Sequence, residues 1–285
     1  MKPFLKRNLL VFFRDKNAVF FSLLGVFVII GLYVLFLGDM LVKNMEDVLG
    51  ARFLMDSWII AGLLAVTPVT TSLGSLDLMI EDRQNKIYKD FSASPIKKSS
   101  LAGGYILNSF IVSLILTFLT FLLGEGYIIM NGGELLNIEA TFKVFGIIIL
   151  STLSSCFMMT FVVSFFKSSS AFAAASTVIG TLIGFLTGVY IPIGELPGSV
   201  QTVVKLFPPA HSAVLLRQIM MEGAEKVSFA GASKEIIEEF HLSLGSSFSL
   251  GDKILNSYTS IIYILVTAVV FAILSISQVR RKVRY

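Results

Sequence analysis

A short polar segment with charges of both signs, residues 81–95, interrupts a chain that is otherwise mostly apolar. Its sequence is Glu81-Asp82-Arg83-Gln84-Asn85-Lys86-Ile87-Tyr88-Lys89-Asp90-Phe91-Ser92-Ala93-Ser94-Pro95. Carboxylates and cations this close together suit recognition by charged hydrogen bonds, and truncating one partner of such a buried contact often costs about 2–5 kcal/mol. A passive membrane anchor has no need of such a segment. A transport subunit driven by a separate protein does need one, because force must be received at a defined polar surface.

A helix over residues 81–91 would place several of these side chains on one face, since residues three or four apart are neighbours on a helix. Ile87 or Tyr88 would add an apolar anchor. The segment also carries three acidic residues, so a role in setting the membrane topology by positive charge does not by itself explain its composition. The alternative is a solvated loop whose charges only set the topology. The residues predicted to dock a partner are Glu81, Asp82, Arg83, Lys86, Ile87, Tyr88 and Asp90.

Residue types that would indicate catalysis or metal binding are not clustered in this sequence. No GxxxxGK[ST] motif occurs, so the chain holds no ATP by a P-loop. The two histidines, His211 and His241, lack metal-ligand spacing, and His211 is interpreted as structural. Cys156 is the only cysteine, which excludes an intrachain disulfide or a cysteine-based metal site. We predict no catalytic, cofactor-binding or metal-binding residues.

The composition indicates a membrane protein. Hydrophobic residues make up 55% of the chain, charged residues 15%, and the mean hydropathy is +0.82. A soluble domain would carry roughly a quarter charged residues, and about 20 apolar helical residues span a bilayer core. Membrane β-strands would alternate over about 10 residues, which is not seen here. The six uncharged runs are Ala18 to Leu37, Trp58 to Leu76, Leu101 to Gly124, Val144 to Phe166, Ser168 to Gly194, and Tyr258 to Val279.

These runs predict the fold class: an all-α polytopic membrane protein with six transmembrane helices in one domain, residues 1–285. Residues 1–17 read as an amphipathic interfacial helix, with Leu5, Leu9, Phe12 and Phe13 forming its apolar side. The alternative is a plain basic flank. The first run is too long for a signal peptide's apolar region and lacks a small-x-small cleavage site. It is therefore a retained helix.

The distribution of lysine and arginine predicts the orientation. Six helices put both termini on one side, and that side carries 15 of the 23 basic residues but only 5 of the 19 acidic ones. A basic excess marks the cytoplasmic side. The segment 77–100 is then a cytoplasmic loop, both termini are cytoplasmic, and the net charge of +4 gives no support to nucleic-acid binding.

The outer loop, residues 195–257, opens with two apolar stretches that are too short to span. They are 200–207 and 210–221, separated by Pro208 and Pro209, which prevent one continuous helix. Stretches of this length indicate re-entrant or interfacial helices. Residues 234–244 are a further amphipathic candidate.

Small and hydroxylated residues mark the predicted spans. Gly180, Gly184 and Gly188 recur every four residues, a spacing that allows close approach of membrane helices. This favours either a pore-lining helix near a symmetry axis or ordinary packing within one subunit. Hydroxyl groups either join helices or line a polar path. The candidates for substrate path or dimer packing are Thr67, Thr70, Thr71, Ser75, Thr177, Gly180, Thr181, Gly184 and Gly188; Ser109, Ser113, Thr117 and Thr120 form a similar stripe.

Charged residues are missing from the middle of all six runs. Proton- or ion-coupled transporters usually place ionisable residues there. A secondary transporter or channel is therefore disfavoured but stays open as an alternative, and an enzyme or a non-transporting scaffold has no clustered groups to support it.

The sequence resembles the ABC-2 type permeases of ABC transporters. The family shows a G-hydrophobic-P step after its fifth helix and a proline-led stretch ending in arginine before its sixth. The corresponding segments here are Gly188-Val189-Tyr190-Ile191-Pro192-Ile193, Leu196-Pro197, Phe207-Pro208-Pro209-Ala210-His211 and Leu215-Leu216-Arg217, with Pro192, Pro208, Pro209 and Arg217 as the outer-face motif. Glu81, Arg83, Asp90, Ser94-Pro95 and Leu101 match the family's loop in order, but Asn85-Lys86 replaces its usual Gly-Thr.

The resemblance implies the permease subunit of an ATP-driven exporter in the plasma membrane of a bacterium. Such a subunit pairs with a second permease copy or paralogue, and the pair binds separately encoded cytosolic ABC ATPase subunits, which hold the ATP and magnesium. Residues 81–91 would be the coupling helix, and the turn at Lys167 a smaller second contact. The uncharged, Phe-rich and Thr-dotted interior suits a hydrophobic or amphipathic cargo, such as a drug, peptide or lipid-like molecule.

Overall fold

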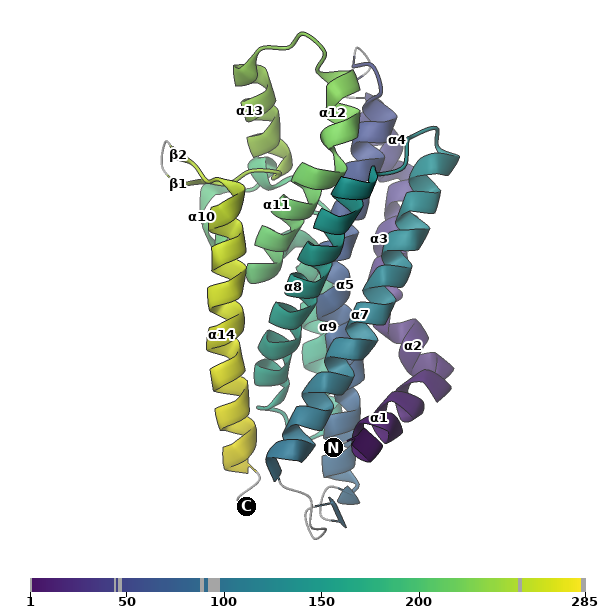
Figure 1. The fold of residues 1–285 in the computed structure, drawn as a ribbon, viewed down its shortest axis with the longest axis vertical. Helices are drawn as coiled ribbons and strands as arrows, with labels where there is room; N and C mark the ends of the chain where they lie inside the picture. The colour runs from purple at the N-terminus through teal and green to yellow at the C-terminus, as the bar shows by residue number, and fades with distance from the viewer. Residues whose placement is uncertain are drawn as a thin grey trace.

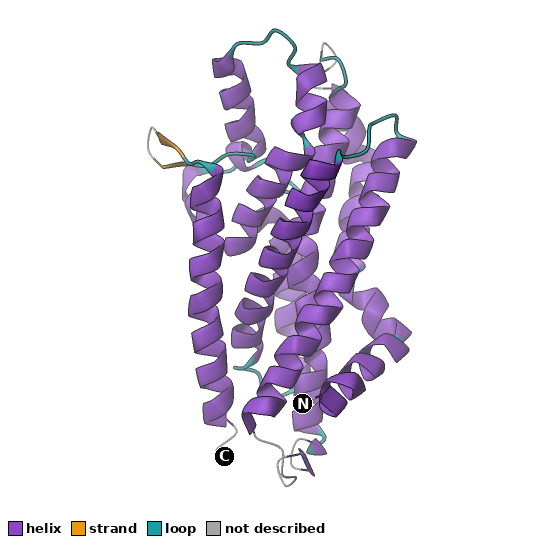
Figure 2. Cartoon of the chain, viewed as in Figure 1, coloured by secondary structure: helices purple, strands orange, loops and turns teal. Residues whose placement is uncertain are grey.

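The computed structural model describes residues 2–43, 45, 48–87, 90–91, 98–250 and 253–282. Almost all of this part of the chain is helical (Figure 2). It contains six helices long and apolar enough to cross a membrane, which confirms an all-α polytopic membrane protein. The candidate spans are Leu24–Lys43, Ala51–Gln84, Ser100–Met130, Ile138–Val163, Ser169–Leu186 and Ser257–Gln278.

The helices run along one long bundle, with both termini at one end and a cluster of short helices at the other (Figure 1). We call these the terminal end and the distal end. The N-terminal elements are α1 (Lys2–Arg14), α2 (Lys16–Ser22), α3 (Leu24–Leu32), the π-helix η1 (Tyr33–Leu37) and α4 (Gly38–Lys43). The long helices are α5 (Ala51–Gln84), α7 (Lys98–Met130), α8 (Ile138–Val163), α9 (Ser169–Leu186) and α14 (Ser257–Lys282).

The first span begins later than the run Ala18 to Leu37 predicts. Asp15 ends α1 and caps α2, because its carboxylate accepts hydrogen bonds from the backbone N–H groups of Asn17 and Ala18 at 2.9 and 3.1 Å. The helix breaks again at Leu23, which separates α2 from α3. Residues 16–22 therefore form a second short helix at an angle to α1, and the candidate span starts at Leu24 (Figure 1).

Helix α1 packs on the bundle through Phe4, Asn8 and Phe12, which are spaced by four residues, and it lies against α7. Of the predicted apolar side, Phe12 is buried, Leu5 and Leu9 are half-buried and Phe13 is exposed. The stripe that meets the bundle therefore shares Phe12 with the predicted side and contains a polar member, Asn8.

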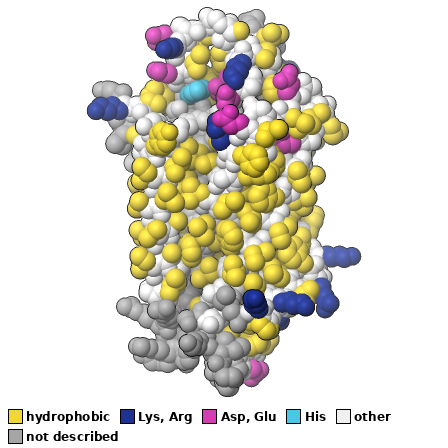
Figure 3. All heavy atoms as spheres, in the orientation of Figure 1, with side chains coloured by type: hydrophobic (Ala, Val, Ile, Leu, Met, Phe, Trp, Pro, Cys, Tyr) yellow, Lys and Arg dark blue, Asp and Glu magenta, His cyan; other side chains and the backbone are white. Residues whose placement is uncertain are grey.

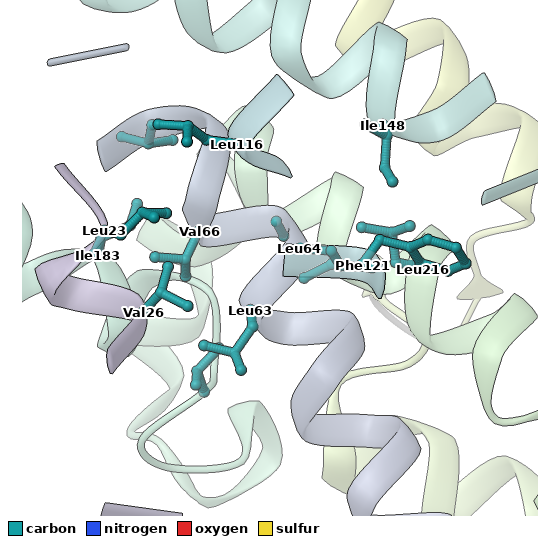
Figure 4. Close-up of a cluster of buried hydrophobic side chains, with 14 of the residues drawn as sticks. Leu23, Val26, Leu63, Leu64, Val66, Leu116, Phe121, Ile148, Ile183 and Leu216 are labelled. Carbon is teal, nitrogen blue, oxygen red and sulfur yellow. The ribbon is translucent and has the colours of Figure 1, made fainter. Parts of the chain in front are cut away.

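Helix α5 is the central element of the bundle. Its most apolar window is 94% buried, and α7, α8, α9 and α11 all pack against it. Figure 4 shows Leu63, Leu64 and Val66 of α5 among side chains from the surrounding helices. At 1.5 Å per residue its 34 residues extend about 51 Å, more than a bilayer core of about 30 Å. One helix therefore reaches both ends of the bundle.

The distal end is built from short helices, as the two prolines predict. These are the 3-10 helix η2 (Ile193–Glu195), α10 (Gly198–Lys205), α11 (Pro208–Met220), α12 (Glu222–Ser228) and α13 (Lys234–Leu244), followed by a hairpin of β1 (Ser249–Leu250) and β2 (Lys253–Ile254). Helix α11 returns into the bundle and packs against α5, α8 and α14. The expected short helices before the last span are present, and α13 has the predicted bounds.

The surface divides into an apolar band and two polar ends (Figure 3). Hydrophobic side chains cover the middle of the bundle in this view, while Lys, Arg, Asp and Glu gather toward its two ends. Helices α9 and α14 are the least enclosed of the later spans, with 17% and 22% of their windows buried. Such a band matches a bilayer around the bundle.

Candidate functional site

The terminal end holds a buried ion pair between α1 and α5. Both terminal nitrogens of Arg7 donate to the carboxylate of Asp82, at 2.6 and 2.9 Å, and the hydroxyl of Tyr105 from α7 donates to it at 2.7 Å. The Asp82 side chain is 1% exposed and that of Arg7 32%. Paired forks of this kind fix geometry as well as charge. The hydrogen bonds that Arg7 donates to Asp82 raise the pKa of Arg7 above its usual value.

Aromatic rings frame this pair. The ring of Phe4 meets those of Phe91 and Tyr105 edge-on, at centroid distances of 5.0 and 5.1 Å, and the Arg7 guanidinium lies 5.6 Å from the Phe91 centroid. Gly104 leaves room for Phe4, because a Cβ there would come within 2.5 Å of the Phe4 ring. Helix α1 is therefore held at the end of α5 by charge, ring contacts and shape together.

The predicted single helix over residues 81–91 does not form. Helix α5 continues to Gln84, and a turn at Asn85 and Lys86 follows, with Lys86 at a φ of 62°. Ile87, Asp90 and Phe91 are helical beyond this turn, and Tyr88 lies outside the described residues. The turn closes by hydrogen bonds from the N–H groups of residues 85 and 86 to Glu81 and Arg83 carbonyls, so the segment changes direction instead of presenting one face.

The turn also divides the predicted docking residues. Asp82 is not exposed for docking, because its carboxylate is buried and bound within this chain. Glu81, Lys86 and Asp90 are exposed, and Arg83 and Ile87 are half-buried. The sign and position of the charges were readable from the sequence, but not which of them face inward.

The second predicted contact lies beside the first. The backbone N–H of Ser169 donates to the side-chain oxygen of Gln84 at 2.9 Å, which joins the α8–α9 turn to the end of α5. Ser168 caps α9 with a hydrogen bond to the Ala171 N–H. Lys167, in this turn, is exposed. Two segments 85 residues apart therefore meet at the terminal end.

The distal end is organised around a second buried arginine. Arg217 of α11 is 0% exposed. Its terminal nitrogens donate to the carbonyls of Gly188 and Gly245, at 2.9 and 3.1 Å, and its guanidinium lies 4.6 Å from the Trp58 ring centroid. The Trp58 indole in turn donates to the Leu244 carbonyl at 2.9 Å. This arrangement, the arginine clamp, joins α5, α11, the end of α9 and the end of α13.

The arginine clamp contains no counter-ion among the described residues. Its acceptors are two carbonyl dipoles and an aromatic face, and the Arg217 Nε has no hydrogen-bond partner there. Burial lowers the pKa of Arg217 to about 9, so the group remains a cation at neutral pH. Gly188 and Gly245, with φ of 66° and 67°, take left-handed conformations that favour glycine.

The prolines of the outer-face motif set up this clamp. Pro192 precedes η2, and Pro208 and Pro209 occupy the first turn of α11, where a missing N–H costs nothing. Ile193, next to Pro192, packs against both Gly188 and Gly245. The motif residues, distant in sequence, therefore support one local structure. The motif residues could be picked out in the sequence, but the hydrogen bond from Arg217 to Gly188 could not.

The three predicted glycines do not lie on one continuous helix. Helix α9 ends at Leu186, before the predicted Gly194, so Gly188 lies outside it. Gly184 packs against the ring of Tyr190 from the same chain, and a Cβ there would come within 2.3 Å of that ring. Gly180 has open space around it. Each glycine has a different environment, because the chain reverses at Thr187 and Gly188 and folds back on α9.

The hydroxyl groups of α5 bond to their own helix. Thr67, Thr71 and Ser75 are buried and donate to the carbonyls of Leu63, Thr67 and Ser72. Thr70 is partly buried and donates to the Thr67 carbonyl, whereas Thr177 and Thr181 of α9 are exposed. In the predicted stripe of α7, Ser113 bonds to Ser72 across the helix pair at 3.1 Å. Serines thus join α5 to α7, which fits the interpretation as contacts between helices.

A further polar cluster near the distal end escaped the sequence analysis. Asp56 of α5 accepts from the Tyr33 hydroxyl at 2.7 Å and from Arg52 at 3.2 Å. Arg52 also reaches Asp39 at 3.1 Å and the Tyr127 hydroxyl at 2.9 Å. The signal was the pair Arg52 and Asp56 at i and i+4, ahead of the run that starts at Trp58. The described residues contain no group of three or more possible metal ligands.

Six candidate spans, a central helix that reaches both ends and a cap of short helices at the distal end define a polytopic membrane protein. The chain belongs to the ABC-2 family of transporter proteins, whose family model matches residues 50–277. The match runs from the start of α5 to near the end of α14. Comparison with curated proteins gives no match. Members of this family are membrane subunits of ABC transporters, generally not catalytic themselves, and work with ABC ATPase subunits.

Proposed function

We propose that this chain is the permease subunit of an ATP-driven exporter, with a separately encoded ATPase docking at the terminal end. The observation that supports it best is the junction of three segments there: α1 is ion-paired to α5, and the α8–α9 turn bonds to Gln84. Because α1 and the α8–α9 turn are both bonded to α5, a movement of either segment would also move the end of α5. Exposed Glu81, Lys86, Asp90 and Lys167 lie at the same end and offer a mixed-charge contact.

The proposed orientation places the terminal end in the cytoplasm, because 15 of the 23 basic residues fall there. ATP binding and hydrolysis on the partner would then bias the bundle between two conformations through differential contact with this end. The ATP and magnesium belong to the partner. This proposal is supported by the sequence of the chain, which contains no P-loop motif.

The proposed assembly contains two permeases, identical copies or paralogues, with α9 at or near their contact. Its window is only 17% buried within one chain. Thr177 and Thr181 lie on its exposed surface together with Val178 and Leu182. An apolar surface with a few hydroxyls suits a hydrophobic or amphipathic substrate, such as a drug, a peptide or a lipid-like molecule, moved outward between the two subunits.

A charge-exchange experiment tests the docking surface. The variant Lys86→Glu with Asp90→Lys inverts both exposed charges and keeps the net charge. Its matched control, Lys143→Glu with Glu139→Lys, inverts an exposed pair at the distal end. We expect at least a tenfold loss of ATPase copurification in the first variant and none in the control.

Three readouts complete this test: the amount of folded protein in the membrane, ATPase copurification and substrate-stimulated hydrolysis. Equal copurification and equal stimulation in the two variants would contradict docking at this end. Loss of folded protein in the first variant alone would assign those charges to folding instead.

A further inference from the structure

An apolar groove opens on the membrane-facing side of the bundle between α7, α8 and α14. Its volume is about 410 Å³, and its lining includes Gly103, Leu107 and Phe110 of α7, Phe157 of α8 and Ile276 of α14. None of its lining residues belongs to α1 or α9 or to either junction described above. Its walls are apolar, so its occupant in a membrane must be apolar too.

The groove lies within one leaflet, next to the terminal end. On α7 the lining runs from Ala102 to Phe110, 4 to 12 residues from the start of the helix. Leu153 and Phe157 are 10 and 6 residues before the end of α8, and Ile276 is six residues before the end of α14. At 1.5 Å per residue these positions are about 6–18 Å from the helix ends. Half of a bilayer core is about 15 Å thick. The groove therefore has the depth of an acyl chain in that leaflet.

The three helices that form the groove all end at basic residues on this side. Helix α7 starts at Lys98, Lys167 follows α8, and α14 ends with Arg280, Arg281 and Lys282. No acidic residue occurs in residues 98–124, 140–194 or 257–285. Clusters of lysine and arginine at the cytoplasmic ends of membrane helices attract anionic lipid headgroups. Here the ends of the three helices that form an apolar groove carry such residues in the sequence.

We propose that this groove binds one acyl chain of an anionic phospholipid, whose phosphate lies among the basic helix ends. The proposal rests on the proposed orientation only for naming the leaflet, the cytoplasmic one. Apolar contact alone selects no lipid, because neighbouring chains in the bilayer are equally apolar. Selectivity comes from the charge of the headgroup, and the groove fixes where the molecule lies.

The test uses the full chain alone, without an ATPase, reconstituted with equal amounts of phosphatidylglycerol and phosphatidylcholine. Native mass spectrometry after gentle detergent extraction counts retained lipids. We expect retained phosphatidylglycerol to exceed phosphatidylcholine by about fivefold in the unaltered chain. Ile276→Trp should fill the groove and abolish this excess. Ile273→Trp, at a position 65% exposed on the same helix and outside the groove, should leave it unchanged.

A second pair of variants tests the headgroup. Neutralising Arg280, Arg281 and Lys282 to glutamine should remove the preference, whereas neutralising Lys2, Lys6 and Arg14 of α1 should not. Equal retention of both lipids by the unaltered chain would overturn the proposal. So would equal retention in both tryptophan variants, or a dimer mass that Ile276→Trp alone abolishes, since a second copy would then cover the groove. Because no ATPase is present, these results are independent of the proposed transport function.

Discussion

The two ends of the bundle each bury an arginine, but they stabilise it in different ways. At the terminal end, Arg7 meets a carboxylate and keeps 32% of its side chain exposed. At the distal end, Arg217 is fully buried and meets only carbonyls and the Trp58 ring. This ion pair can separate when α1 leaves the bundle, because Arg7 is already partly exposed and both partners would then regain water. A buried cation on fixed carbonyls has no such alternative, so the distal end is built to hold its shape.

Removal of Arg217 should have the largest effect. Arg217→Ala leaves the Gly188 and Gly245 carbonyls without their donor, opens a cavity beside Trp58 and should destabilise the protein by about 4 kcal/mol or more. Arg217→Lys keeps the positive charge but not the two parallel hydrogen bonds of the guanidinium. Its stability should lie between that of the unaltered protein and that of Arg217→Ala. Thermal unfolding in detergent measures both, with exposed Lys226→Ala as the control. An unchanged midpoint in Arg217→Ala would show that the clamp is not structural.

Separation of the terminal ion pair should cost less. Arg7→Gln and Asp82→Asn should each destabilise the docking of α1, and their coupling in a double-mutant cycle should be about 2 kcal/mol. Protease cleavage between α1 and α3 reports undocking, and thermal unfolding reports the whole bundle. Because the terminal ion pair separates more easily than the arginine clamp, cleavage between α1 and α3 should rise at temperatures well below the unfolding midpoint. Additive single effects would instead show that the pair carries no net coupling.

Acidification should weaken the distal end through His211. This ring donates from Nε2 to the Lys205 carbonyl at 2.9 Å, accepts from Ser260 at 3.0 Å and stacks on Tyr263 at 4.2 Å. Burial lowers its pKa below 6.5, so the folded state binds the proton less well than the unfolded state. Stability is therefore full above about pH 6.5 and falls below it.

The measurement is the thermal midpoint between pH 7.5 and 5, compared with His211→Gln. The glutamine variant should lack part of this pH dependence. Cleavage of α1 should stay level over the same range, because the Arg7 pKa lies far above it. Parallel pH profiles for the two proteins would assign the effect to other groups.

The smallest expected effect is at Lys86. A lysine at a φ of 62° is strained by about 1 kcal/mol, and glycine there relieves that strain while adding freedom to the unfolded chain. Lys86→Gly should raise stability by about 0.5 kcal/mol and leave the arginine clamp untouched. Lys226→Gly, in the middle of α12, should be destabilising and serves as the comparison. A loss of stability in Lys86→Gly would indicate that the turn is not left-handed.

Hydropathy was sufficient to predict the six spans and the short distal helices, because membrane length and proline set them directly. It could not place the start of the first span, because Asp15 and Leu23 interrupt the helix through capping and backbone geometry, not through polarity. Asp82 shows a similar limit. A carboxylate in a charged segment reads as exposed, and only the distant partners Arg7 and Tyr105 explain why it is buried.

The glycines show what spacing cannot decide. Three glycines four residues apart fit a continuous helix, but Gly188 is instead the point where the chain turns and offers its carbonyl to Arg217. That bond joins residues 29 apart. The arginine clamp likewise depends on Trp58 and Gly245, which no local pattern connects to Arg217. Sites made of one motif were readable from the sequence, whereas sites made by packing several elements together were not.

The ion pair at the terminal end also constrains how the chain is made. Arg7 and Asp82 are 75 residues apart, and Tyr105 follows 23 residues later. During synthesis α1 therefore emerges with an uncompensated cation until the second span, which carries Asp82 near its end, has been made. Under the proposed orientation, Arg7 and its basic neighbours would act in that interval as a topogenic signal that keeps the N-terminus in the cytoplasm. The same guanidinium would first help to orient the nascent chain. After Asp82 has been synthesised, it holds α1 on the end of α5.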